Sequence, residues 1–88
     1  MKVIEMKIID PAGLHARPAS LLVKEASKFK SDVELESGEK KTTLKSILGI
    51  MSLGVKADAD IKIYIDGEDE NVAEESIAKF LVDNNLAV

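Results

Sequence analysis

Cysteine is absent from this 88-residue chain, and aromatic residues make up only 3% of it. Without cysteine there is no disulfide, no thiolate nucleophile and no cysteine-based metal site. The aromatic residues are Phe29, Tyr64 and Phe80. With so few of them, the core has to be built from Ile, Leu, Val and Ala.

Long apolar runs are also missing. No stretch approaches the roughly 18 consecutive apolar residues that a membrane span needs. The first ten residues alternate polar and apolar positions, which is typical of a strand and unlike a signal peptide. We therefore expect a cytoplasmic protein without a membrane partner.

The charge is modest and unevenly distributed, with a formal net charge of −4. Residues 1–56 hold ten Lys and Arg against seven Asp and Glu, a net charge of +3. Residues 57–88 hold two against nine, a net charge of −7. This balance argues against a nucleic-acid partner. A basic face in the first part could still meet an acidic partner or hold an anion.

Length and composition are those of one small globular domain, because 45% of the residues are hydrophobic and 32% are charged. We expect a single domain over residues 1–88. We also expect a monomer, since no further interface is evident.

Hydrophobic periodicity predicts four strands and three helices in the order strand–helix–strand–strand–helix–strand–helix. The strands are expected over residues 2–9, 32–37, 40–43 and 60–66. The helices are expected over residues 16–29, over residues 47–53 and after Asp69, which can cap the last helix.

These elements favour an α+β fold with two layers, in which the helices cover one face of the sheet and the other face is wet. The strand–helix–strand unit at the start implies a near-parallel relation between its two strands. Ser46 is expected to cap the short second helix, and Gly54 is expected to end it. The order of strands in the sheet does not follow from the pattern.

His15, the only histidine, lies between a glycine-containing loop and a helix start. The first amides of a helix lack internal partners, and the helix dipole makes that end attractive to phosphate. Arg17 can add a charge-assisted hydrogen bond to the same anion. A neutral imidazole is a nucleophile near pH 7, so the pattern indicates a transiently phosphorylated histidine.

Simpler interpretations of the same residues exist. His15 could be a polar helix cap, and Arg17 could be a solvated surface residue. A metal site is not expected, because one histidine without a second histidine or a cysteine does not make a site.

Two segments resemble the HPr family, the histidine-containing phosphocarriers of the sugar phosphotransferase system. Residues 13–19, GLHARPA, are similar to the active-site signature of the family. Residues 44–54, LKSILGIMSLG, are similar to its second signature, around a regulatory serine. The resemblance covers essentially the whole chain. It implies an open-faced β-sandwich with an antiparallel sheet of order 1-4-2-3, covered on one face by three helices.

The resemblance also implies roles for the residues around His15. The Nδ1 atom of His15 would accept a phosphoryl group from phosphorylated enzyme I and pass it to the A domains of sugar permeases. Arg17 would balance the phosphate charge, and the backbone amides of Ala16 and Arg17 would donate to the phosphate. Such a protein is a carrier with a covalent intermediate and not an enzyme in the strict sense, and no cofactor is implied.

Ser46 matches the position that HPr kinase/phosphorylase modifies in Gram-positive-type bacteria. The added negative charge would disfavour docking to enzyme I. It would favour a catabolite-control transcription regulator and so link the protein to carbon catabolite repression. The pattern alone favours a plain helix cap, and one serine can serve both roles.

The short second helix is apolar on two faces, so one of these faces has to point outward. The docking candidates on that face are Ile47, Leu48 and Met51. The candidates for a basic rim are Lys24, Lys28 and Lys45. Core packing would also explain such apolar residues, and solubility would also explain the lysines.

Two related functions stay open. One is a nitrogen-branch phosphocarrier, which keeps the histidine, although residues 44–54 resemble the sugar-type version more closely. The other is a mainly regulatory HPr paralogue, a class that lacks the histidine. Ala12 departs from the family pattern, because many relatives have serine there. Whether Asp69 contacts the phosphorylation site does not follow from the sequence.

Overall fold

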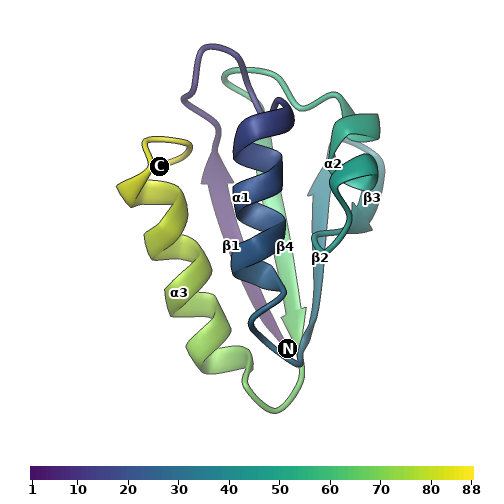
Figure 1. Cartoon of the computed structure of the whole chain (residues 1–88), viewed down its shortest axis with the longest axis vertical. Helices are drawn as coiled ribbons and strands as arrows, with labels where there is room; N and C mark the ends of the chain where they lie inside the picture. Colours follow the sequence, from purple (N-terminus) through teal and green to yellow (C-terminus); the bar gives the residue numbers. More distant parts are fainter.

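The computed structural model describes residues 1–88 and contains the seven predicted elements in the predicted order (Figure 1). The strands are β1 (Lys2–Lys7), β2 (Asp32–Ser37), β3 (Lys40–Thr43) and β4 (Asp60–Asp66). The helices are α1 (Ala16–Ala26), α2 (Ile47–Leu53) and α3 (Glu70–Asp83). None of them combines the length and the apolar composition that crossing a membrane requires.

The sheet is antiparallel throughout and has the order β1-β4-β2-β3, which confirms the order that the family resemblance implied. β1 and β2 run in the same direction, as the strand–helix–strand unit suggested, but they do not pair. β4 lies between them and forms hydrogen bonds with both. Each central strand thus has antiparallel neighbours on both sides.

The core lies between the sheet and the helices, which all cover the same face (Figure 1). The register aligns Ile4 with Ile63 and Ile63 with Leu35, so buried side chains form rows across the strands. The helices contribute Ala19, Leu22, Ala26, Ile50, Ala73, Ile77 and Leu81. All of these residues are aliphatic, and the two phenylalanines are only partly buried at the margin of the core. The prediction of an aliphatic core is confirmed.

Helix α1 ends at Ala26, three residues before the predicted end. Two hydrogen bonds of i to i+3 type close its last turn, from the Lys28 amide to the Glu25 carbonyl (3.3 Å) and from the Phe29 amide to the Ala26 carbonyl (3.2 Å). Phe29 still packs against the core from this tighter turn, and that contact explains why the apolar pattern extends past the helix.

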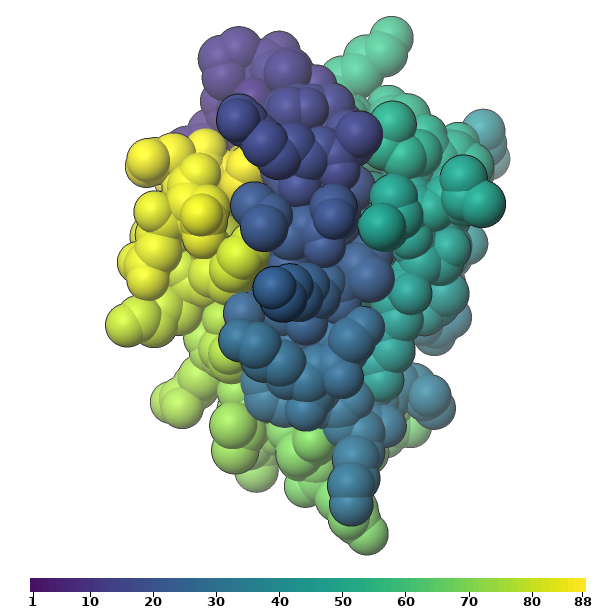
Figure 2. All heavy atoms as spheres, viewed as in Figure 1, coloured from purple at the N-terminus to yellow at the C-terminus, as the bar shows by residue number.

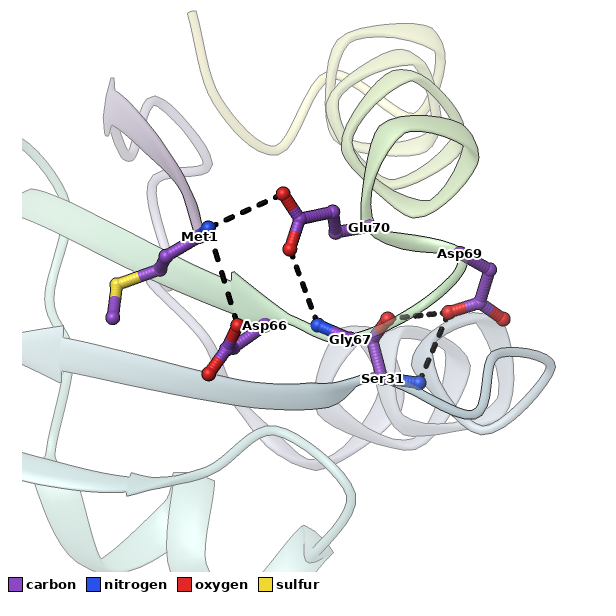
Figure 3. A network of polar contacts seen from close by, with 6 residues as sticks. All are labelled: Met1, Ser31, Asp66, Gly67, Asp69 and Glu70. Atoms are coloured by element: carbon purple, nitrogen blue, oxygen red, sulfur yellow. Dashed lines mark hydrogen bonds and ion pairs between the residues drawn. The ribbon is translucent and has the colours of Figure 1, made fainter.

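Asp69 stands at the start of α3, but its side chain does not cap that helix as predicted. Its carboxylate accepts hydrogen bonds from the amides of Lys30 (2.8 Å) and Ser31 (3.0 Å) and from the Ser31 hydroxyl. Figure 3 shows this carboxylate directed at Ser31, in the turn between α1 and β2. Asp69 therefore joins two turns that are far apart in sequence.

The same corner is closed by Gly67 and Glu70. A side chain at Gly67 would clash with Ser31, and the backbone of Gly67 has φ +157°, so glycine is required there. Glu70 accepts hydrogen bonds from the Gly67 amide and from the ammonium group of Met1, both at 3.2 Å (Figure 3). The start of β1, the end of β4 and the start of α3 are thus held together.

Replacing Asp69 with Asn should lower stability at pH 7 and also change its pH dependence. Hydrogen bonds from Ser31 and Lys30 lower the pKa of Asp69. The stability it contributes is therefore complete above the unfolded-state pKa of about 3.9 and is lost as the pH falls through the lower folded-state value. The free energy of unfolding, measured with urea at pH 7, 5, 4 and 3, should be higher for the wild type than for Asp69→Asn. This difference should shrink below about pH 4.

The matched control is Asp58→Asn. Asp58 is exposed, forms no side-chain hydrogen bond, and has φ 70°, which Asn tolerates. This variant should unfold like the wild type at every pH. If the difference in the free energy of unfolding between the wild type and Asp69→Asn is the same at pH 7 and pH 3, the ionised carboxylate of Asp69 is not the stabilising group.

Candidate functional site

His15 is the residue from which α1 begins. Its backbone is extended (φ −83°, ψ −174°), and its carbonyl accepts the first helical hydrogen bond, from the Ala19 amide at 3.0 Å. Its imidazole makes no capping hydrogen bond and is only partly buried. The polar-cap interpretation of the sequence therefore does not describe this side chain, and its ring nitrogens make no hydrogen bond within the chain.

Two backbone donors lie open beside His15. The amides of Ala16 and Arg17 donate no hydrogen bond within the chain, and Pro18 has no N–H to donate. Unpartnered amides at a helix N-terminus carry partial positive charge and bind anions. The imidazole of His15 thus stands next to two unpartnered amides, those of Ala16 and Arg17.

The loop before His15 is fixed by its own hydrogen bonds. One carboxylate oxygen of Asp10 accepts from the Ala12 amide, and the carbonyl of Asp10 accepts from the Gly13 amide, both at 2.9 Å. Gly13 has φ +69°, and a side chain there would clash with the Val55 carbonyl oxygen. That carbonyl also accepts from the Leu14 amide at 3.1 Å. Glycine is required at position 13 because the segment after α2 packs directly against this loop.

A shallow hollow of about 260 Å³ lies at His15 and Arg17. Its lining comes from the loop before α1, from the first turns of α1 and from the C-terminal segment, which lie next to one another in Figure 2. Its other lining residues are Asp10, Pro18, Leu21, Asn84 and Leu86. The guanidinium of Arg17 takes part in none of the ion pairs of the structure, so its charge is available to an anion.

Sequence reasoning missed most of this lining. Asn84 and Leu86 come from the opposite end of the chain, so no local pattern links them to His15. Leu21 could have been predicted to lie near the site, since it follows Arg17 by one helical turn and therefore shares its face of the helix. A larger hollow of about 560 Å³ involves outward-facing residues of the sheet, among them Glu5, Glu36 and Lys62, but it lies away from His15 and holds no histidine.

Ser46 caps α2 as predicted. Its hydroxyl oxygen accepts a hydrogen bond from the Gly49 amide at 3.0 Å, and the helix ends at Gly54, which has φ +62°. Gly49 leaves no room for a side chain against Thr42, so the start of α2 lies directly on β3. Ser46 is only partly buried, which leaves it accessible from solvent.

The outer face of α2 is apolar and exposed. Leu48 is 83% exposed, Met51 42% and Ile47 41%, whereas Ile50 is fully buried. Leu21 on the neighbouring α1 is also exposed, at 44%, and lines the hollow at His15. Figure 2 shows α1 in the middle of this face of the molecule with α2 beside it. The expected outward direction of the three α2 residues is confirmed.

The three lysines differ in what they can offer a partner. Lys24 and Lys28 are exposed on α1, and Lys28 pairs with Glu25 at 3.0 Å. The expectation for Lys45 was wrong: its ammonium donates to the carbonyls of Phe29 and Ser31, both at 2.9 Å. These carbonyls belong to the turn after α1 and lack other partners, so Lys45 serves the fold and is not a free rim charge.

Asp69 is not part of the His15 site. Its partners Lys30 and Ser31 follow the end of α1, whereas His15 precedes its start. In Figure 1 the turn between β4 and α3 lies at the opposite end of α1 from residue 15. The open question of a contact to the phosphorylation site is thereby answered by the fold.

Comparison with known proteins was made on the whole chain. A family model described as the PTS HPr component phosphorylation site matches residues 3–83. The phosphocarrier protein HPr of Lysinibacillus sphaericus is 46% identical over 87 residues, which is 99% of each chain. The histidine-containing phosphocarrier protein of a Mycoplasma has a solved structure with a TM-score of 0.94 and 41% identity, covering 97% of both chains.

A second solved structure, HPr-C-His from Thermoanaerobacter tengcongensis, has a TM-score of 0.89 and 42% identity. It covers 97% of this chain and 94% of its own. The family model, the relatives and the strand order agree over nearly the full length. The chain therefore belongs to the HPr family, the phosphocarriers of the phosphotransferase system.

Proposed function

We propose that this chain carries a phosphoryl group on Nδ1 of His15, taking it from phosphorylated enzyme I and passing it to the A domains of sugar permeases. The observation that carries the proposal is the uncapped imidazole beside two open amides and the unpaired Arg17. A phosphate oxygen at this helix start can accept from the Ala16 and Arg17 amides and from the guanidinium.

The transfer needs little from the carrier beyond position and charge. The lone pair of Nδ1 attacks phosphorus, the P–N bond of a phosphoimidazole donor breaks, and the donor nitrogen keeps that electron pair. One P–N bond is broken and one is formed. Arg17 and the helix start offset the negative charge that arrives. Onward transfer is the same step in reverse, with a permease domain as acceptor.

The presence of His15 favours a carrier over a mainly regulatory paralogue of the family. A nitrogen-branch carrier would use the same histidine, so only the choice of enzyme I separates it from the sugar carrier. A cytoplasmic location stays a prediction.

The exposed apolar face of α2 supports a docking role for Ile47, Leu48 and Met51. Exposed apolar side chains that cluster on one helix face mark an interaction site more often than scattered ones do, and methionine adapts to several partners. Leu21 of α1 is a further exposed apolar residue, and it lines the hollow at His15. Lys24 and Lys28 are the remaining candidates for a basic rim that meets an acidic partner.

Ser46 is proposed as a regulatory site for HPr kinase/phosphorylase. It sits at the start of α2, so a phosphate there adds about 1.5 to 2 negative charges beside the apolar docking face. This charge would repel an acidic enzyme I. It would suit a partner with basic groups, such as a catabolite-control transcription regulator.

His15→Ala should abolish phosphate uptake from phosphoenolpyruvate and enzyme I, measured by intact mass. The wild type should gain one acid-labile, base-stable phosphate. The imidazole forms no hydrogen bond, so the variant should keep its stability within about 0.5 kcal/mol. Uptake by the variant, or no uptake by the wild type from either the sugar or the nitrogen enzyme I, would remove the carrier proposal.

Ser46→Asp and Ser46→Ala should change opposite properties. Asp is a good N-cap and adds charge, so Ser46→Asp should stay stable but accept phosphate from enzyme I about fivefold more slowly. Ala removes the hydrogen bond from Gly49 and should lower the free energy of unfolding by about 0.5–2 kcal/mol, with near-normal phosphate uptake. If phosphate uptake is slowed equally in both variants, the loss of the serine cap explains the effect and the added negative charge does not.

The double variant Leu48→Ala, Met51→Ala should raise the KM of enzyme I for this carrier about tenfold, because both side chains are exposed and apolar. Its free energy of unfolding should change by no more than about 0.5 kcal/mol per site. Val72→Ala is the matched control, since Val72 is 60% exposed on α3. If the control raises the KM equally, α2 is not the docking face.

A further inference from the structure

One acidic residue, Asp10, lines the hollow that holds His15 and Arg17. The other lining residues are neutral or, in Arg17, positive. An acid is unexpected there, because the remaining features of the site all attract an anion. Its role is not explained by the need to bind phosphate.

Asp10 is held in place without a cation. One carboxylate oxygen accepts from the Ala12 amide at 2.9 Å, and the group takes part in none of the ion pairs. Asp10 is partly buried, so water screens its charge less than on an open surface. A negative charge without a partner cation therefore belongs to a residue that lines the same hollow as His15.

Such a charge weakens the phosphorylated state. A phosphoryl group brings about two negative charges, which Arg17 and the two open amides attract and a nearby carboxylate repels. A phosphocarrier has to transfer its phosphoryl group to an acceptor as readily as it accepts the group from a donor. Attraction without any opposing charge would leave the group bound and raise the barrier to onward transfer.

We propose that the Asp10 carboxylate destabilises phosphorylated His15 and so keeps its phosphoryl group transferable. This inference rests on the proposed function of His15. The hydrogen bond to Ala12 is a separate, structural role of the same side chain, because it needs an oxygen acceptor but no charge.

Asp10→Asn separates the two roles, since the amide oxygen can still accept from Ala12 while the charge is gone. Wild type labelled with ¹⁵N is mixed with an equal amount of unlabelled variant, catalytic enzyme I and limiting phosphoenolpyruvate. The phosphate then exchanges between two identical histidines, and the same P–N bond is broken and formed. The ratio of the two phosphorylated proteins, read by intact mass, reports only the surroundings of His15.

At low salt the Asp10→Asn variant should hold the phosphate in about three- to tenfold excess over the wild type, from the loss of one nearby charge. In about 0.5 M salt the excess should fall towards one, because screening weakens the repulsion. A merely structural role would not give this salt dependence. Asp32→Asn, which removes a negative charge on the outer side of the sheet, should give a ratio near one at both salt concentrations.

A ratio near one for Asp10→Asn at low salt would overturn the inference, as would an excess that salt does not change. In either case labelled wild type that takes up phosphate leaves the proposed function standing. If wild type alone takes up no phosphate from a competent enzyme I, the proposed function fails, and the inference fails with it.

Discussion

The position of β4 between β1 and β2 determines how the site is assembled. Because β4 runs antiparallel to β1, the segment that enters β4 lies beside the segment that leaves β1. Ile8 exchanges hydrogen bonds with Asp58 and Ala59, and the Val55 carbonyl accepts from Leu14. The loop before His15 is thus supported by residues that follow α2. Two regions that are more than 40 residues apart in sequence thus support the segment that carries the imidazole.

Only a few groups determine the electrostatic potential around His15. The start of α1 offers two open amides, Arg17 adds a full positive charge, and Asp10 opposes them. None of these charges is neutralised by an ion pair within the chain. The site therefore differs from a buried salt bridge, in which each charge is satisfied before any ligand arrives. Here the amides at the start of α1 and the charges of Arg17 and Asp10 have no partner within the chain. The sum of their electrostatic interactions with a bound anion decides how tightly that anion is held.

Local patterns allowed most of the fold to be predicted, because alternation and helical spacing are set by residues close in sequence. The strands, the cap at Ser46 and the outward face of α2 follow from such patterns. Contacts between distant segments did not: Asp69 binds Lys30 and Ser31, and Lys45 binds the carbonyls of the same turn. At the site, His15 and Arg17 were predictable from one short segment. Asn84 and Leu86 were not, because only the folded chain brings them there.

The start of α1, which contributes to the hollow at His15, and helix α2 with its exposed apolar residues lie on the same face of the molecule. Under the proposed function, donor and acceptor therefore have to approach the imidazole from one side. On that proposal the two could not occupy this face together, so no ternary complex would form and each transfer would be complete before the next begins. Partners would compete for one binding surface, and their relative concentrations would set the net direction of phosphoryl transfer.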